Sequence, residues 1–144
     1  MGIEENKDIV RRMVDEGWNP NNQATLNELM AEDLVNHDPV APEVRSREDL
    51  EAFHASRVAG FPDQHTTVDD LIAEGDLVAK RWTFRGTHQG DFQGIPPTGQ
   101  QVTVQGVSVY RINNGKITEI WWGYDTLGVL QQLRVIPQQE QAPA

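Results

Sequence analysis

Two histidines in this sequence stand close to acidic or amide side chains. His88 lies three residues before Asp91, and His37 stands between Asn36 and Asp38. An imidazole titrates near neutral pH, so a histidine with such a neighbour can move protons. The structural alternative is a loop histidine that bonds only to backbone, or a turn of the kind that Asp-Pro favours. We predict that His88 and His37 form an acid–base pair.

Two further polar residues have both a structural and a functional interpretation. His54 falls on the apolar stripe of a predicted helix, where an inward polar side chain needs a partner and could also meet a ligand. Asp125 follows the last predicted strand and precedes a helix, where aspartate is a good N-cap. A carboxylate there could also orient a catalytic histidine, so Asp125 joins the candidate catalytic residues.

Aromatic residues recur on the segments that should surround these groups. Strand alternation puts Lys80, Trp82 and Phe84 on one face of a predicted strand. Aromatic residues are most often simply part of a core, but here they accompany inward polar groups. The predicted substrate-binding residues are Trp18, Asn36, Phe53, His54, Trp82, Ser108, Tyr110 and Trp122.

Composition excludes several classes of site. The 144 residues include no cysteine, so there is neither a thiol nucleophile nor a thiolate metal site. No His-Glu-x-x-His pair and no phosphate-binding glycine loop occurs, and we predict neither metal nor cofactor. The formal net charge of -10 disfavours nucleic acid. No apolar run approaches the roughly 20 residues of a membrane span, and the N-terminus does not resemble a signal peptide, so we expect a cytoplasmic protein.

Periodicity predicts helices followed by strands. Apolar spacings of three and four predict helices at Ile3–Trp18, Ala24–Met30, Arg47–Ala59 and Thr126–Leu133, with Ser46 capping the third. The inner face of that third helix carries Leu50, Phe53, His54, Arg57 and Val58. Strands are predicted near Leu34–His37, His65–Ala73, Leu77–Arg85, Val102–Ile112 and Lys116–Tyr124. Residues 1–137 should form one domain, and residues 138–144, rich in Gln, Pro and Ala, a flexible tail.

The last two strands form a hairpin that can be read in two registers. A two-residue turn at Asn114-Gly115 would pair Val107 with Trp122, whereas a three-residue turn with a bulge would pair Gly106 with Trp122. The second register puts one set of side chains toward the helices: Ser108, Tyr110, Ile120 and Trp122. Its other face carries Val107, Val109, Ile117, Glu119 and Trp121. Both faces are largely apolar, so both need to be covered.

This order of elements predicts an α+β fold. The sheet should be mostly antiparallel and curved into a cone, with the N-terminal helices packed on its concave face. A cone of this kind encloses space for a small molecule.

Several segments resemble one protein family. The run Gly94-Ile95-Pro96-Pro97-Thr98-Gly99, the Asn-Gly hairpin after Tyr110-Arg111, and the ending that starts at Asp125-Thr126-Leu127-Gly128 are similar to the SnoaL-like polyketide cyclases. These proteins belong to the nuclear-transport-factor-2-like superfamily of cone-shaped α+β domains. The resemblance covers roughly residues 5–137, and it implies the fold more strongly than a reaction.

The resemblance also implies positions for the catalytic residues. In the defining cyclases an Asp on the last strand is the general acid and base, with a His on the preceding strand nearby. Those positions fall on Trp122 and Ser108 here, so the defining pair is missing. The positions of a loop histidine, a pocket asparagine and a second aspartate do match, at His88, Asn36 and Asp125.

We therefore expect a protein that binds a small, largely apolar organic molecule. As an enzyme it would catalyse cofactor-independent proton transfer, such as a cyclisation, isomerisation or hydration, with His88, His37 and Asp125 as catalytic residues. The alternative is a non-catalytic binding or scaffold protein of the same fold, which the aromatic residue at position 122 favours. We also expect a homodimer through the outer sheet face at Val107, Val109 and Trp121.

Overall fold

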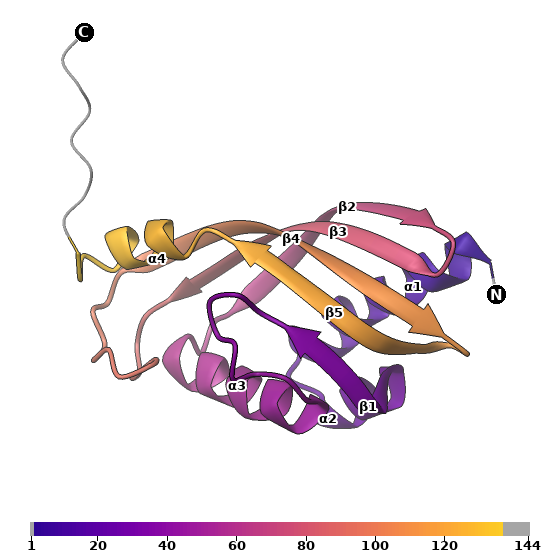
Figure 1. The fold of residues 1–144 in the computed structure, drawn as a ribbon. Coiled ribbons are helices and arrows are strands. Elements are labelled where there is room, and N and C mark those ends of the chain that lie inside the picture. The colour runs from indigo at the N-terminus through magenta and orange to yellow at the C-terminus, as the bar shows by residue number, and fades with distance from the viewer. Residues whose placement is uncertain (1, 137–144) are drawn as a thin grey trace, which may run out of the picture.

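The computed structural model describes residues 2–136 as a single five-stranded sheet with helices packed against it (Figure 1). The helical elements are α1 (Ile3–Arg12), a π-helical segment (Met13–Trp18), α2 (Gln23–Leu29), α3 (Arg47–Gly60) and α4 (Thr126–Gln132). The strands are β1 (Met30–His37), β2 (His65–Glu74), β3 (Leu77–Thr87), β4 (Gln101–Asn113) and β5 (Lys116–Tyr124). The predicted tail at residues 138–144 lies outside the described residues.

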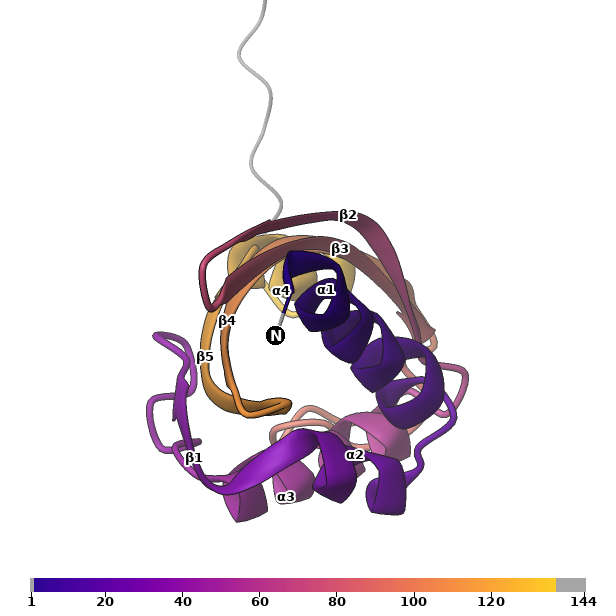
Figure 2. The ribbon, with the colours of Figure 1, turned by 90° about the vertical axis from the view of Figure 1, so that its right-hand side faces the viewer.

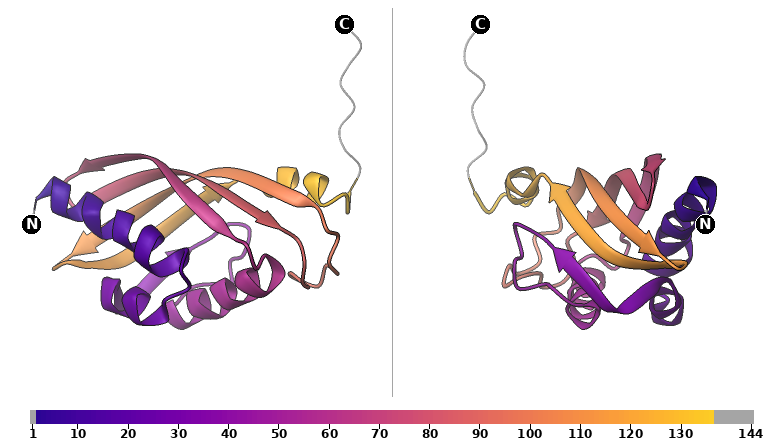
Figure 3. Two further views of the ribbon diagram at one scale, coloured as in Figure 1. Left: turned by 180° about the vertical axis from the view of Figure 1, so that it is seen from behind. Right: turned by 45° about the vertical axis from the view of Figure 1, so that its right-hand side comes forward.

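The sheet is curved, and its concave side faces the helices. The strand order is β1-β5-β4-β3-β2, with β1 parallel to β5 and every other pair antiparallel. Figure 2 shows the sheet bending around α1, while α2 and α3 close the side that the sheet leaves open. Figure 3 shows the same arrangement from behind, with α1 running along the sheet. The predicted α+β fold, with N-terminal helices on the concave face, is confirmed.

Local sequence explains where α3 begins and which face it buries. The Ser46 hydroxyl accepts the Asp49 N–H at 3.1 Å, and the Asp49 carboxylate accepts the Ser46 N–H at 3.1 Å, so the predicted capping box is formed. Hydrogen bonds from the backbone N–H groups of Arg45 and then Ser46 hold the pKa of the Asp49 carboxyl below its usual value. Leu50 and His54 are buried, one turn apart on the face toward the sheet. The same face carries Arg57.

The first helix changes its winding before it ends. Ile9, Val10, Met13 and Val14 are buried, as their spacing predicts. From Met13 the winding is π-helical, and the Asn19 N–H donates to the Val14 carbonyl, five residues earlier. The prediction of a single regular helix to Trp18 is therefore correct in extent but not in winding. The segment ends with Trp18 buried against α3.

The hairpin of β4 and β5 adopts neither predicted register. Asn113 pairs with Lys116 across a two-residue turn, and both turn residues have positive φ, 52° at Asn114 and 78° at Gly115. Thr118 is then an extra residue, because Ile112 pairs with Ile117 but Arg111 pairs with Glu119. This bulge shifts the register by one, so that Ser108 lies opposite Trp122.

The bulge decides which side chains face the helices. Ser108, Tyr110, Ile120 and Trp122 lie on the concave face, as the second register predicts. Ile117 is fully buried, so its predicted place on the outer face is wrong. The physical reason is that the bulge reverses the alternation of side chains between Ile117 and the rest of β5.

Two clusters of buried apolar residues occupy the concave side. The larger joins α1, the π-helical segment, α2 and part of α3 to β4 and β5. The smaller lies toward α4 and includes Phe61, Trp82, Phe84 and Leu133. Trp122 packs against both clusters. Within residues 2–136, no helix is long and apolar enough to cross a bilayer.

Candidate active site

A cavity of about 130 Å³ lies between α3, α4 and the concave face of the sheet. Most of its wall is aromatic or aliphatic, and the aromatic part comprises Trp18, Phe53, Phe61, Trp82, Phe84, Phe92, Trp122 and Tyr124. Its ionisable side chains are few: Asp38, His54, Arg57 and Tyr124. An apolar enclosure with a few polar groups is the usual form of a small-molecule site.

Asp38 is the one carboxylate among the described residues that line this cavity. It follows β1 directly, and its side chain is 8% exposed. One carboxylate oxygen, Oδ1, accepts the backbone N–H groups of Val40 at 2.9 Å and Ala41 at 3.2 Å. The other, Oδ2, accepts the hydroxyl of Tyr124 at 3.0 Å. Since a carboxylate oxygen can accept two hydrogen bonds, Oδ2 keeps one free site for a ligand.

Arg57 and His54 are hydrogen-bonded to each other in the cavity wall. An Arg57 Nη2–H donates to His54 Nδ1 at 2.9 Å, and because arginine can only donate, Nδ1 must be the unprotonated nitrogen. The His54 proton is then on Nε2. Burial, reinforced by the nearby Arg57 charge, lowers the pKa of His54 to about 3, so His54 is neutral at pH 7. Burial also lowers the pKa of Arg57 to about 10, which leaves it charged.

A second buried cation lies deeper in the sheet. Lys80 is 2% exposed, and its Nζ lies 5.2 Å from the ring of Tyr110, 5.8 Å from Trp122 and 5.9 Å from Trp82. Burial, followed by the charge of Arg57, lowers the pKa of Lys80 to about 7. Within residues 2–136 neither cation belongs to an ion pair. In a protein of net charge -10, two cations without an ion pair thus lie in or near a cavity lined by one carboxylate, Asp38.

Hydrogen bonds fix the two tryptophans of the cavity floor. The Trp82 indole N–H donates to the Ser108 hydroxyl at 2.9 Å, and the Trp122 indole N–H donates to the Asn36 amide oxygen at 2.6 Å. Lys80, Ser108 and Trp122 are successive partners across β3, β4 and β5. The floor is therefore an aromatic surface held by hydrogen bonds, with the Lys80 ammonium against its two tryptophan rings.

The predicted substrate-binding residues divide into two groups. Five line the cavity: Trp18, Phe53, His54, Trp82 and Trp122. The other three, Asn36, Ser108 and Tyr110, are buried but do not line it. Two of these three hold the floor tryptophans, and Tyr110 contacts both Trp122 and Lys80.

His88 is buried in the loop that follows β3 and does not line the cavity. Its Nδ1 accepts the backbone N–H of Thr98 at 3.2 Å and lies 3.0 Å from the Thr98 hydroxyl, and its ring stacks on Phe61. These contacts tie the two ends of the loop together. Asp125 also lies outside the cavity lining, and its carboxylate caps α4 by accepting the Gly128 N–H at 2.8 Å.

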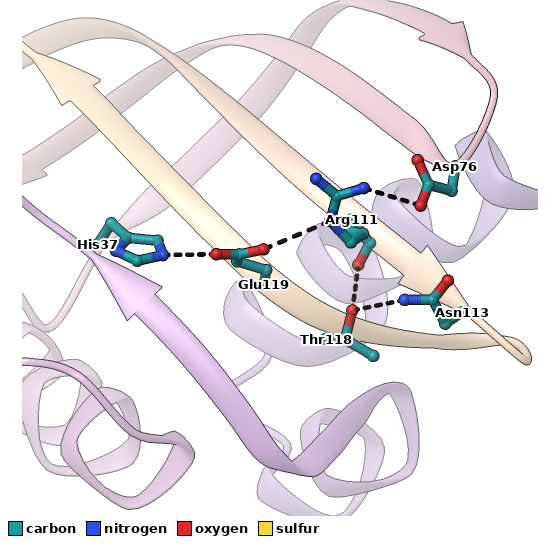
Figure 4. Close-up of polar contacts among 6 residues, drawn as sticks. All are labelled: His37, Asp76, Arg111, Asn113, Thr118 and Glu119. Atoms are coloured by element: carbon teal, nitrogen blue, oxygen red, sulfur yellow. Dashed lines mark hydrogen bonds and ion pairs between the residues drawn. The ribbon is translucent and has the colours of Figure 1, made fainter.

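His37 lies on the outer face of the sheet. Its Nε2 is 2.7 Å from the Glu119 carboxylate, its ring stacks on Trp121, and 43% of the side chain is exposed. Glu119 also binds Arg111, which binds Asp76, so a polar chain crosses this face (Figure 4). The prediction that His37 and His88 face one another across a cavity is wrong, because alternation along β1 turns Asn36 inward and His37 outward.

Four residues at or near this cavity were not indicated by the sequence as candidates for chemistry: Asp38, Arg57, Lys80 and Tyr124. Two of them, Arg57 and Lys80, lie on helix and strand faces that the sequence predicts to point inward. Their inward position is the signal that could have identified them. A cation at an inward position is usually paired with an acid, and the chain has 22 acids to choose from. Only the assembled structure shows that none of the described acids pairs with either one.

Comparison with known proteins places this geometry in a family. The sequence profile of the SnoaL-like polyketide cyclases matches residues 8–133. The aklanonic acid methyl ester cyclase DauD of Streptomyces sp. strain C5 is 29% identical over 132 residues, which cover 88% of this chain and 80% of DauD.

Solved structures show the same likeness. The putative polyketide cyclase IdmH of Streptomyces antibioticus is 35% identical, with a TM-score of 0.80 over 90% of this chain and 98% of its own. The putative hydroxylase AclR of Streptomyces galilaeus is 29% identical, with a TM-score of 0.86 over 97% of this chain and 87% of its own. Because the profile spans nearly the whole domain and the fold agrees throughout, the chain belongs to the SnoaL-like polyketide cyclase family.

Proposed function

We propose that the protein is a cyclase-type enzyme that removes a proton from carbon next to a carbonyl group and needs no cofactor. The substrate would be a polyketide-like molecule, since the chain belongs to the SnoaL-like polyketide cyclases and DauD is named as a cyclase of aklanonic acid methyl ester. The observation that carries the proposal is Asp38, a buried carboxylate that shares an aromatic cavity with a cation.

Asp38 would be the general base. Backbone N–H groups and the Tyr124 hydroxyl fix its orientation, so the free site on Oδ2 has a defined direction. Burial, and then the carboxylate of Asp38, raise the pKa of Tyr124, so its phenol keeps its proton at neutral pH. Such preorganisation lets a base act without rearrangement during the reaction.

The charges around the cavity would favour the enolate that proton removal creates. Arg57 is cationic at pH 7, and Lys80 is partly so with a pKa of about 7. Positive charge in a water-poor site stabilises a developing anion more than it would in water. The enolate carbon would then form a bond to a second carbonyl carbon of the same molecule in a ring closure of the aldol type, and the alkoxide that results would take the proton back from the Asp38 carboxyl group.

This assignment would move the base relative to the family pattern. On the resemblance given above, the defining Asp of the family would fall on Trp122, whose indole N–H donates to Asn36. Asp38 directly follows β1, the strand next to β5, and lies two residues beyond Asn36. Trp122 and Asp38 both line the cavity, which supports a base supplied from the end of β1.

The proposal is tested by deuteration of 1-tetralone, a bicyclic ketone with one exchangeable CH₂ group, followed by proton NMR in D₂O. The protein should raise the exchange rate by about 100-fold or more over buffer, the usual contribution of a positioned base. An Asp33→Asn variant is the matched control, because Asp33 is an exposed acid of β1 without an ion pair. It should keep the full rate.

Equal rates with and without protein would contradict the proposal. If 1-tetralone broadens the NMR resonances of protein residues that line the cavity, but its deuterium exchange is no faster than in buffer, the alternative of a non-catalytic binding protein is favoured.

A further inference from the structure

Hydrogen-bond donors outnumber acceptors around Arg57. The guanidinium carries five N–H groups, and its recorded partner is the unprotonated nitrogen of His54. Arg57 Nε, His54 Nε2 and Trp18 Nε1 are buried without a partner in the described structure. All three side chains line the cavity.

These donors lie together. The Trp18 and His54 rings are 4.6 Å apart, and the Arg57 guanidinium carbon lies 5.8 Å from the Trp18 ring and 5.6 Å from the Phe84 ring. The aromatic rings favour the cation but give its N–H groups no acceptor in the plane of the guanidinium. Arg57 is half-buried, and because it lines the cavity, a ligand there can reach it.

The Arg57 side chain is half-buried as a whole, but its Nε is buried, and a charged group with a buried donor that lacks an acceptor is costly and is normally paired. Within residues 2–136 no carboxylate forms an ion pair with Arg57, and Lys80, the neighbouring charged group deeper in the sheet, has the same sign. Asp38 lines the same cavity but forms no ion pair with Arg57, so a ligand group that brings both negative charge and acceptor atoms would satisfy these donors.

We propose that Arg57, with His54 beside it, binds a free carboxylate of the ligand. A planar carboxylate matches the guanidinium fork and offers up to four lone pairs to donors that now lack acceptors. Neutral His54 adds an N–H donor without adding charge. The inference rests on the proposed function only in taking the occupant to be the substrate, which would then be an aromatic or polycyclic carboxylic acid rather than its ester.

The test compares 2-naphthoate with its neutral isostere 2-naphthamide by isothermal titration calorimetry at neutral pH. Charge-assisted hydrogen bonds predict that the wild-type protein binds the carboxylate at least about 10-fold more tightly. Arg57→Gln should abolish this preference while it leaves the affinity for the amide unchanged. Arg85→Gln, which removes an exposed arginine of β3, should keep the preference.

Three results would overturn the inference. They are no binding of 2-naphthoate to the wild-type protein, equal binding of the two probes, or a preference that survives Arg57→Gln. If Arg57→Gln does not fold by circular dichroism, Arg57→Lys replaces it, and loss of at least half of the preference in binding free energy is expected because the fork is gone. Because 1-tetralone has no carboxylate, its exchange tests the proposed base and not the carboxylate site. Absence of exchange with a preserved preference for 2-naphthoate would contradict only the proposed function, and the opposite pair of results would contradict only this inference.

Discussion

Lys80 shows how a single buried side chain can carry a pH dependence. It is 2% exposed, lies against three aromatic rings, and forms no ion pair with any other described residue. In the unfolded chain its pKa returns to the ordinary value of 10.5, whereas in the fold it is about 7. Between these values the unfolded state binds the extra proton. Stability must therefore rise with pH across this window and be lowest below about pH 7.

Replacing Lys80 by Met should remove that dependence. Between about pH 7 and pH 9 the free energy of unfolding of the wild-type protein should increase by up to about 1.4 kcal/mol per pH unit from this residue. The Lys80→Met protein should be flatter over the same range and more stable at about pH 6. Urea unfolding at several pH values measures both. Parallel curves for the two proteins would mean that Lys80 titrates normally in the fold.

At the scale of elements, the close contact of β3, β4 and β5 shapes the cavity floor. Gly106 on β4 leaves room for the Trp82 ring, which a Cβ at position 106 would overlap. The same Cβ would stand 2.7 Å from the Gly123 carbonyl oxygen, a contact that real Cβ atoms do not make. The absence of a side chain at position 106 thus lets Trp82 lie flat and reach Ser108.

A Gly106→Ala substitution should therefore displace Trp82. We expect a loss of about 1–3 kcal/mol in unfolding free energy, as for other overpacked sites, and a change in tryptophan fluorescence. Gly123→Ala is the matched control on β5, since a Cβ there meets only the Val107 carbonyl oxygen, at 3.4 Å. Urea unfolding followed by fluorescence compares them. If both variants are equally stable, the close packing around Trp82 does not hold the floor in place.

The elements themselves could be predicted from local sequence, but their exact pairing could not. The capping box at Ser46 and the alternation along β3 are local signals, and both structures formed as predicted. The extra residue at Thr118 has no local signal, because Asn113 and Arg111 stabilise it from the other strand. This bulge places the Ile117 side chain in the core and not on the outer face of the sheet. The lack of an ion pair at Arg57 among the described residues likewise depends on the whole fold. The sequence does not show which acidic residues come close to Arg57 when the chain folds.

At the scale of the whole molecule, the outer sheet face is the remaining large surface to account for. Val107 is 49% exposed, and Val109 and Trp121 are half-buried beside it. The face is less apolar than the sequence suggested, because Ile117 is buried and the His37–Glu119–Arg111–Asp76 chain crosses it (Figure 4). His37 and Arg111 flank the Trp121 ring. A symmetric contact between two copies would cover the valines and could share these ionic groups.

We propose that the protein is a homodimer through this face. Light scattering should give nearly twice the chain mass of 16.2 kDa, and Trp121→Glu should shift the protein toward monomer by placing charge at the centre of the contact. Leu127→Glu is the control, because Leu127 is 57% exposed on α4, away from this face. A wild-type protein that stays monomeric at high micromolar concentration would contradict the dimer.

The central claim is that Asp38 removes a proton from a ketone bound in the cavity. The most direct test is a variant in which one carboxylate oxygen of Asp38 is replaced by an amide nitrogen. Asp38→Asn keeps the shape and the hydrogen bonds of the turn but loses the basic carboxylate. The saturating rate of 1-tetralone deuteration should fall by about 100-fold or more relative to wild type. The affinity for 2-naphthoate, measured on the same samples, should not fall. An Asp38→Asn protein that exchanges 1-tetralone as fast as the wild type would contradict the account.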